Sequence, residues 1–131
     1  MIDCEYEVYT RISNRLKKNF NRISVSGEYV ASPPSFPHVS IVQTDSGTYR
    51  KTRDSDGEHH ARVEFEINVY SNKPGHRKEE CKDIINIIND VMVDMNFRRT
   101  SLSPVVNLLD ANIYRIVTRY SGVAGEDKFY G

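Results

Sequence analysis

The stretch Ala61-Arg62-Val63-Glu64-Phe65-Glu66-Ile67-Asn68-Val69-Tyr70 alternates strictly between apolar and polar side chains until the final tyrosine. Successive side chains of a β-strand point to opposite faces of a sheet, so this alternation predicts a strand with one buried face. The odd-numbered residues would face the core. The even-numbered face, which carries Arg62, Glu64 and Glu66, would meet water or a partner.

The residues that follow predict a helix that covers this strand. Segment 71–75 breaks the strand and supplies capping residues with an early proline, Pro74. From there to Met95, apolar residues recur at three- and four-residue steps, as on the buried side of a helix. This apolar stripe consists of Cys81, Ile84, Ile85, Ile88, Val91, Met92 and Met95. Ile87 widens it, so we expect this helix to pack deeply against the strand, with a core of Phe65, Ile67, Ile84, Ile85, Ile88 and Met92.

Toward the N-terminus, the sequence predicts another helix and two strands. The helix has a single apolar face made of Val8, Tyr9, Ile12, Leu16 and Phe20, with Asp3 as its expected N-cap. Segments 22–30 and 38–44 predict strands. The three prolines within 32–37 cannot donate ladder hydrogen bonds, so that segment is expected to form a loop or a sheet edge.

Toward the C-terminus, the sequence predicts a hairpin. Segment 97–109 is expected to be extended, with Pro104 marking a bulge or an edge. A turn at 110–112 would lead into a strand over 113–120, followed by a polar tail over 121–131. The elements then follow the order α-β-β-β-α-β-β. We therefore predict one domain over 1–131, of the α+β class, in which two helices and a mainly antiparallel sheet form a two-layer sandwich.

One long segment, 45–60, has no aliphatic side chain and two glycine-centred turns. A long polar excursion in a small domain often carries function. Its basic cluster could contact phosphates or acidic groups, or could be solvated charge balanced by the neighbouring acids. The residues proposed to contact a partner here are Tyr49, Arg50, Lys51, Arg53, Asp54 and Asp56.

Composition limits the class of protein. The chain has 131 residues, of which 38% are hydrophobic and 27% charged, a globular rather than a disordered composition. Its 18 basic and 18 acidic residues cancel, which argues against a general binder of nucleic acid. There is no apolar run of the roughly 20 residues that a membrane helix needs, and the charged N-terminus has no signal-peptide core. We therefore expect synthesis in a cytoplasm, with Cys4 and Cys81 as reduced, partly buried thiols.

Few residue patterns suggest chemistry. His59 and His60 are adjacent and would point to opposite faces of a strand, so they do not predict a shared metal ion. Segment 54–57 resembles part of a calcium loop, but Val63 would stand where that loop requires a carboxylate. No nucleophile elbow or phosphate-binding glycine loop occurs. His38 and His76 are interpreted as ordinary surface or boundary histidines, and no catalytic residue, metal or cofactor is expected.

Two carboxylates, Glu64 and Glu66, share a strand face. They could form a paired-carboxylate site, but a cross-strand ion pair with Arg115 or Arg119 is the simpler interpretation. These four residues and Arg62 form the candidate interface with a neighbouring subunit or partner.

Together these segments resemble the tail terminator, or tail-completion, family of long-tailed bacteriophages and prophages. The likeness is carried by the alternating strand ending at Ser71, by the helix starting Lys73-Pro74-Gly75, and by the closing strand Ile113-Tyr114-Arg115-Ile116-Val117-Thr118-Arg119-Tyr120-Ser121-Gly122. It covers Tyr6 to Gly122 as an order of elements, with no single diagnostic motif.

The resemblance implies a structural virion protein without enzymatic activity. Such a subunit forms a ring, commonly a hexamer, at the head-proximal end of the tail. The ring caps the tail tube protein, ends its polymerisation and presents a surface to the head connector, while DNA passes through its lumen without sequence specificity. Within such a ring, segment 45–60 could line the lumen or clasp the neighbouring subunit. Another neck component, such as a head-completion or stopper protein, is an alternative that gene order would separate. A second alternative is a small ligand-binding domain or enzyme built around His60, Glu64 and Glu66.

Overall fold

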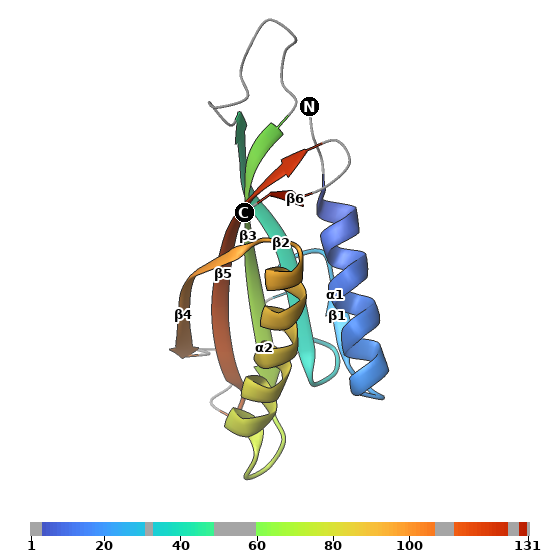
Figure 1. Ribbon diagram of the computed structural model, residues 1–131. Helices are drawn as coiled ribbons and strands as arrows, with labels where there is room; N and C mark the ends of the chain where they lie inside the picture. Colours follow the sequence, from blue (N-terminus) through green and yellow to red (C-terminus); the bar gives the residue numbers. More distant parts are fainter. Residues whose placement is uncertain (1–3, 31–32, 49–59, 107–111, 126–128, 131) are drawn as a thin grey trace, which may run out of the picture.

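A computed structural model of the chain describes residues 4–30, 33–48, 60–106, 112–125 and 129–130 (Figure 1). It has two helices on one face of a mostly antiparallel sheet, so the predicted α+β class is confirmed. The elements are α1 (Glu5–Asn19), β1 (Ser24–Ser26), β2 (His38–Thr48), β3 (His60–Ser71), α2 (Arg77–Asp94), β4 (Arg98–Val106), β5 (Tyr114–Gly125) and β6 (Phe129–Tyr130).

The strands lie in the order β1-β2-β3-β5-β4, and β6 also pairs with β5. All pairs are antiparallel except β1 with β2. β3 therefore occupies the centre, between β2 and β5. Its pairing with β5 runs from His60 opposite Gly125 to Ser71 opposite Tyr114, so the strand with the clearest alternation also has the longest ladder.

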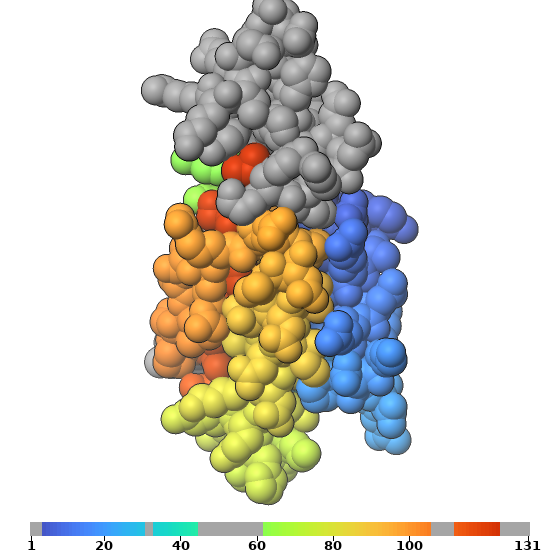
Figure 2. All heavy atoms as spheres, viewed as in Figure 1, coloured from blue at the N-terminus to red at the C-terminus, as the bar shows by residue number. Residues whose placement is uncertain are grey.

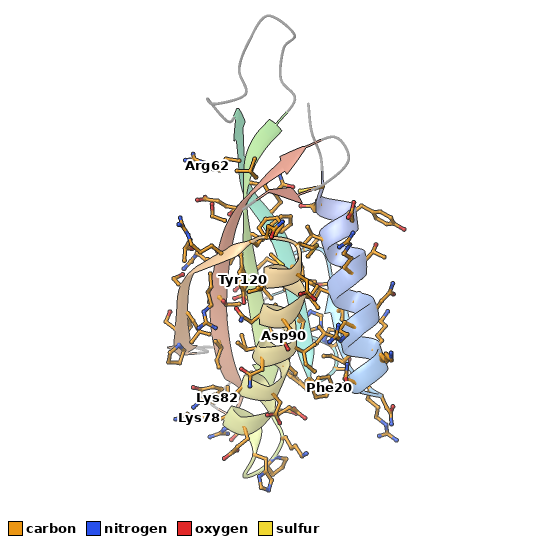
Figure 3. All side chains as sticks on the ribbon, viewed as in Figure 1. Phe20, Arg62, Lys78, Lys82, Asp90 and Tyr120 are labelled. Carbon is orange, nitrogen blue, oxygen red and sulfur yellow. The ribbon has the colours of Figure 1, made fainter. Side chains whose placement is uncertain are left out.

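The core lies between β3 and the helices, as the alternation predicts. Val63, Phe65, Ile67 and Val69 are fully buried. The predicted stripe of α2 is buried along its whole length, from Cys81 to Met95. Tyr120 of β5 points under α2 (Figure 3), and its hydroxyl bonds to Asn89 Oδ1 at 3.1 Å. The Tyr120 ring is therefore buried between the two layers, while its hydroxyl group keeps a hydrogen-bond partner.

The N-terminal helix is confirmed, and its residues Val8, Ile12 and Leu16 are fully buried. The expected N-cap, Asp3, lies outside the described residues. Cys4 occupies the cap position without a side-chain cap bond, and Glu5 begins the helix. Glu5 Oε2 accepts a hydrogen bond at 3.2 Å from the backbone N–H of Gln43, which ties α1 to β2.

Three predicted boundaries are wrong, and in each case backbone pairing decides the outcome. β2 continues to Thr48 and β3 starts at His60, so the ends of the predicted excursion 45–60 belong to the sheet. A bulge between Gln43 and Asp45 lets the polar end of β2 keep pairing with β3. Residues 49–59 lie outside the description. β1 covers only Ser24–Ser26 of the predicted strand 22–30.

The third correction concerns the C-terminal segment. β5 continues to Gly125 instead of giving way to a polar tail at residue 121, and β6 pairs with it. The reason is the length of β3, whose residues 60–64 pair with residues 121–125. Gly122 also lets the chain pass directly over the Phe97 ring, because a side chain there would collide with it.

The last strand on this side of the sheet is β4, as Pro104 indicated. Its bulge, however, lies between Arg99 and Ser101 and not at the proline. Pro104 itself pairs with Ile116. An edge strand tolerates proline because the missing N–H faces away from the ladder.

Candidate functional site

The five residues of the predicted interface lie on the sheet face opposite the helices, which we call the outer face. Pairing of β3 with β5 sets Glu66 opposite Arg119 and Tyr70 opposite Arg115. Glu64 lies opposite Ser121, and Arg62 lies farther along β3, toward the end of the sheet that extends past α2 (Figure 3). The structure thus brings the predicted residues onto one surface, spread along two strands.

The expected cross-strand ion pair forms between Glu66 and Arg119, with Arg119 Nη2 at 3.3 Å from Glu66 Oε2. Glu66 Oε1 also accepts a bond at 3.2 Å from Asn68 Nδ2. The carboxylate is therefore held by one cation and one amide, which favours the ion pair over a paired-carboxylate site. Because the Arg119 side chain is half exposed, the pair contributes at most about 1 kcal/mol.

Arg115 is not a free surface cation. Its Nε and Nη2 donate to Asn68 Oδ1 at 2.9 and 2.7 Å. Its guanidinium carbon lies 5.4 Å from the centre of the Tyr29 ring and 5.6 Å from that of Tyr70. This arrangement fixes the cation between two aromatic faces. Arg115 therefore fastens the segment around Tyr29 onto the sheet.

The segment at Tyr29 covers part of the outer face, for which the alternation predicted contact with water or with a partner. Asn68 and Tyr70 point to this face, yet each is only 1% exposed. Burial raises the pKa of Tyr70 to about 12, and the positive charge of Arg115 opposes that rise. Glu28 helps to hold the cover in place, because its carbonyl accepts a bond at 2.6 Å from Ser40 Oγ of β2. Farther along the face, Arg62 and Arg119 are exposed, and Glu64 and Glu66 are partly exposed.

His38 is buried, which corrects its interpretation as a boundary histidine. It is 2% exposed, with Nδ1 2.9 Å from Ser24 Oγ and Nε2 3.2 Å from Ser26 Oγ. Ser26 donates its one hydroxyl proton to Glu28 O at 2.8 Å, so it must accept from Nε2–H. Neutral His38 then carries its proton on Nε2 and accepts from Ser24. Burial lowers the pKa of His38, and the ring joins β1 to β2.

Several of the predicted site residues cannot be compared with the structure. Tyr49, Arg50, Lys51, Arg53, Asp54 and Asp56 are outside the described residues, as is His59, and His60 is described only in its backbone. His76 is exposed at the start of α2. Within the described part of the chain, no three His, Cys, Asp or Glu side chains cluster in a way that could hold a metal ion.

Both cysteines are buried and neither forms a disulfide, so their burial is deeper than the partial burial expected from the sequence. Cys81 Sγ lies 3.8 Å from Val69 O and 3.6 Å from Tyr114 O, between α2 and the sheet. Burial raises the pKa of the Cys81 thiol to about 12, and the neighbouring Glu80 carboxylate adds to that rise. A thiol held protonated in this way is a poor nucleophile.

Sequence reasoning missed a groove between the two helices. The helices lie over one face of the sheet (Figure 1) and are side by side on the surface (Figure 2). The groove that they line has a volume of about 400 Å³. It is lined by Arg11, Asn14, Arg15, Lys18, Val91 and Asp94. The available signal was the spacing of the three cations, which lie four and three residues apart and so share one side of α1.

Comparisons with protein-family models and with curated proteins found no match to this chain. No helix in the described ranges has the length and apolar character needed to cross a membrane.

Proposed function

We propose that this chain is a ring-forming structural subunit of the tail terminator type. In this role it would sit at the head-proximal end of a phage or prophage tail, cap the tail tube and provide the surface for head joining. The proposal combines the resemblance in element order with one observation on the fold. That observation is a sheet that extends beyond its own helical cover.

The extended part of the sheet is formed by the ends of three strands. β2 reaches Thr48, β3 starts at His60 and β5 reaches Gly125, and all three continue past the end of α2 (Figure 1). Neither described helix covers this end of the sheet, which makes it suited to contact a neighbouring subunit. We assign it as one of the two contact surfaces in a ring.

A ring of identical subunits requires a second, different surface that complements the first. The β4 edge is the candidate, because it is the last strand on its side and carries exposed apolar side chains. Leu102 is 42% exposed and Val105 is 37% exposed. The bulge after Arg99 and the proline at 104 disfavour addition of another strand along this edge. Contact through side chains, centred on Leu102, is the mode that we propose.

The remaining partners follow from the resemblance. They are the tail tube protein below the ring, the head connector or stopper protein above it, and DNA passing through the lumen. No cofactor or catalytic residue enters this proposal. The subunit would be made in the cytoplasm of the bacterial host and retained in the virion.

Native mass spectrometry of two matched variants tests the proposal. Leu102→Glu places a charge on the β4 edge, whereas Val93→Glu makes the same change on α2, where Val93 is 53% exposed. We expect wild type and Val93→Glu to form a closed ring, most simply a hexamer, and Leu102→Glu to remain monomeric. If the ring closes only on the end of the tail tube, the same variants are compared by their incorporation into assembled tails. A strict monomer that is also absent from virions would refute the proposal.

A further inference from the structure

We propose that the groove between α1 and α2 is a docking site for an acidic segment of a partner protein. This inference is independent of the ring, because the groove lies on the helical layer and the proposed ring contacts lie on the sheet. It is carried by the arrangement of charge around the groove.

One wall of the groove is a row of cations on α1. Arg11, Arg15 and Lys18 line it from one side of that helix. Arg15 and Lys18 form no ion pair with any described residue. Arg11 pairs with Glu7 at 2.9 Å, but both side chains are about half exposed, so this pair is weak and exchangeable. Two cations are thus available to a ligand, and a third can be recruited.

The opposite wall, on α2, is different. Asp94 is the one carboxylate in the lining, and Val91, although only 6% exposed, contributes a small apolar surface beside it. Lys17 and Arg22 lie nearby along the chain and are exposed, so the positive potential extends beyond the groove. Because the whole chain has a net charge of zero, this positive region is a local feature.

The mixed lining distinguishes a protein segment from a nucleic acid. A phosphate backbone would gain from the cations but would meet the Asp94 carboxylate, and Val91 offers no ring for bases to stack on. An acidic peptide can satisfy all three kinds of group. Its carboxylates would pair with Arg15 and Lys18, an apolar side chain would rest on Val91, and a backbone N–H would donate to Asp94.

The test uses the full chain and a short fluorescent peptide rich in glutamate, with a leucine at its centre, followed by fluorescence anisotropy at low salt. Arg15→Glu with Lys18→Glu reverses the two available cations of the groove. Lys17→Glu with Arg22→Glu is the matched control, because it changes net charge equally at exposed positions outside the lining. We expect the first pair of substitutions to weaken binding about tenfold or more, and the control pair to weaken it no more than about threefold.

A third variant gives an effect of opposite sign. Asp94→Asn removes the carboxylate of the lining, so peptide binding should become about two- to threefold tighter. Equal losses in the two charge-reversed pairs would overturn the proposal, as would no detectable peptide binding to wild type. Tighter binding of a duplex DNA of the same charge, with the same dependence on Arg15 and Lys18, would also overturn it. Circular dichroism confirms that each variant retains its helices.

Discussion

Replacing Gly122 by alanine tests how closely the second half of the sheet packs against the loop after α2. A Cβ atom at Gly122 would lie 2.6 Å from Cδ1 and 2.9 Å from Cε1 of Phe97. The Phe97 ring is 3% exposed and packs edge-on against Phe65, with ring centres 5.7 Å apart. The ring therefore has neighbours on both sides and little space to move into.

The expected cost follows from this geometry. An ordinary van der Waals contact begins near 3.4 Å, so the added methyl group would be about 0.8 Å too close. Overpacking of a buried site costs roughly 1–3 kcal/mol. Alanine also restricts the unfolded chain, which stabilises the fold by roughly 0.4–1 kcal/mol where the backbone permits it. We therefore expect Gly122→Ala to lower the free energy of unfolding by about 1–2 kcal/mol.

The assay is urea unfolding followed by circular dichroism, with Gly27→Ala as the control. A Cβ atom at Gly27 would lie 3.8 Å from the nearest atom of Tyr9, which is an ordinary contact, so that variant should be as stable as wild type or slightly more stable. Replacing Phe97 by leucine in the Gly122→Ala background should cost less than the same replacement in wild type. Identical midpoints for the two alanine variants would refute the packing argument.

Three further predictions concern stability and titration. Ile88 is fully buried in the stripe of α2, so Ile88→Ala should lower the free energy of unfolding by about 2–5 kcal/mol, and an unchanged melting midpoint would contradict the helix packing. The pKa of Cys81 is raised to about 12, so its thiol should react with a disulfide reagent near pH 8 only as fast as the chain opens; the rate of a free thiol would be the contrary result. Burial lowers the pKa of His38 below 6.5, so on acidification the unfolded state takes up the proton before the folded state does. The contribution of His38 to stability is therefore complete above pH 6.5 and decreases as the pH falls below that value. Unfolding midpoints at neutral and mildly acidic pH should show this loss in wild type and a smaller one in His38→Gln.

The central elements of this fold could be predicted because burial itself produces the sequence pattern. Val63 to Val69 alternate because one face of β3 meets the helices, and Ile84 to Met92 recur because one side of α2 meets the sheet. The ends of β2 and β5 could not be predicted in this way. Residues 45–48 and 121–125 carry no such apolar pattern, and the backbone ladder of β3 decides that they are strands.

The outer face shows a second limit of prediction from the sequence. Asn68 and Tyr70 carry polar groups, so the alternation places them in water, yet a distant segment at Tyr29 covers them. The pairing of Glu66 with Arg119 could be foreseen, because it needs only matched positions on neighbouring strands. The groove between the helices could not be foreseen, because the spacing of the cations on α1 does not reveal which part of α2 lies opposite them.

The most direct test of the proposed function is electron microscopy of phage tails with a gold-labelled antibody against this chain. The account predicts label at the head-proximal end of tails, both in complete virions and in free tails from a mutant that makes no heads. Label in virions but not in headless tails would indicate a head-completion or stopper protein instead. The absence of label from every virion and tail would contradict the account.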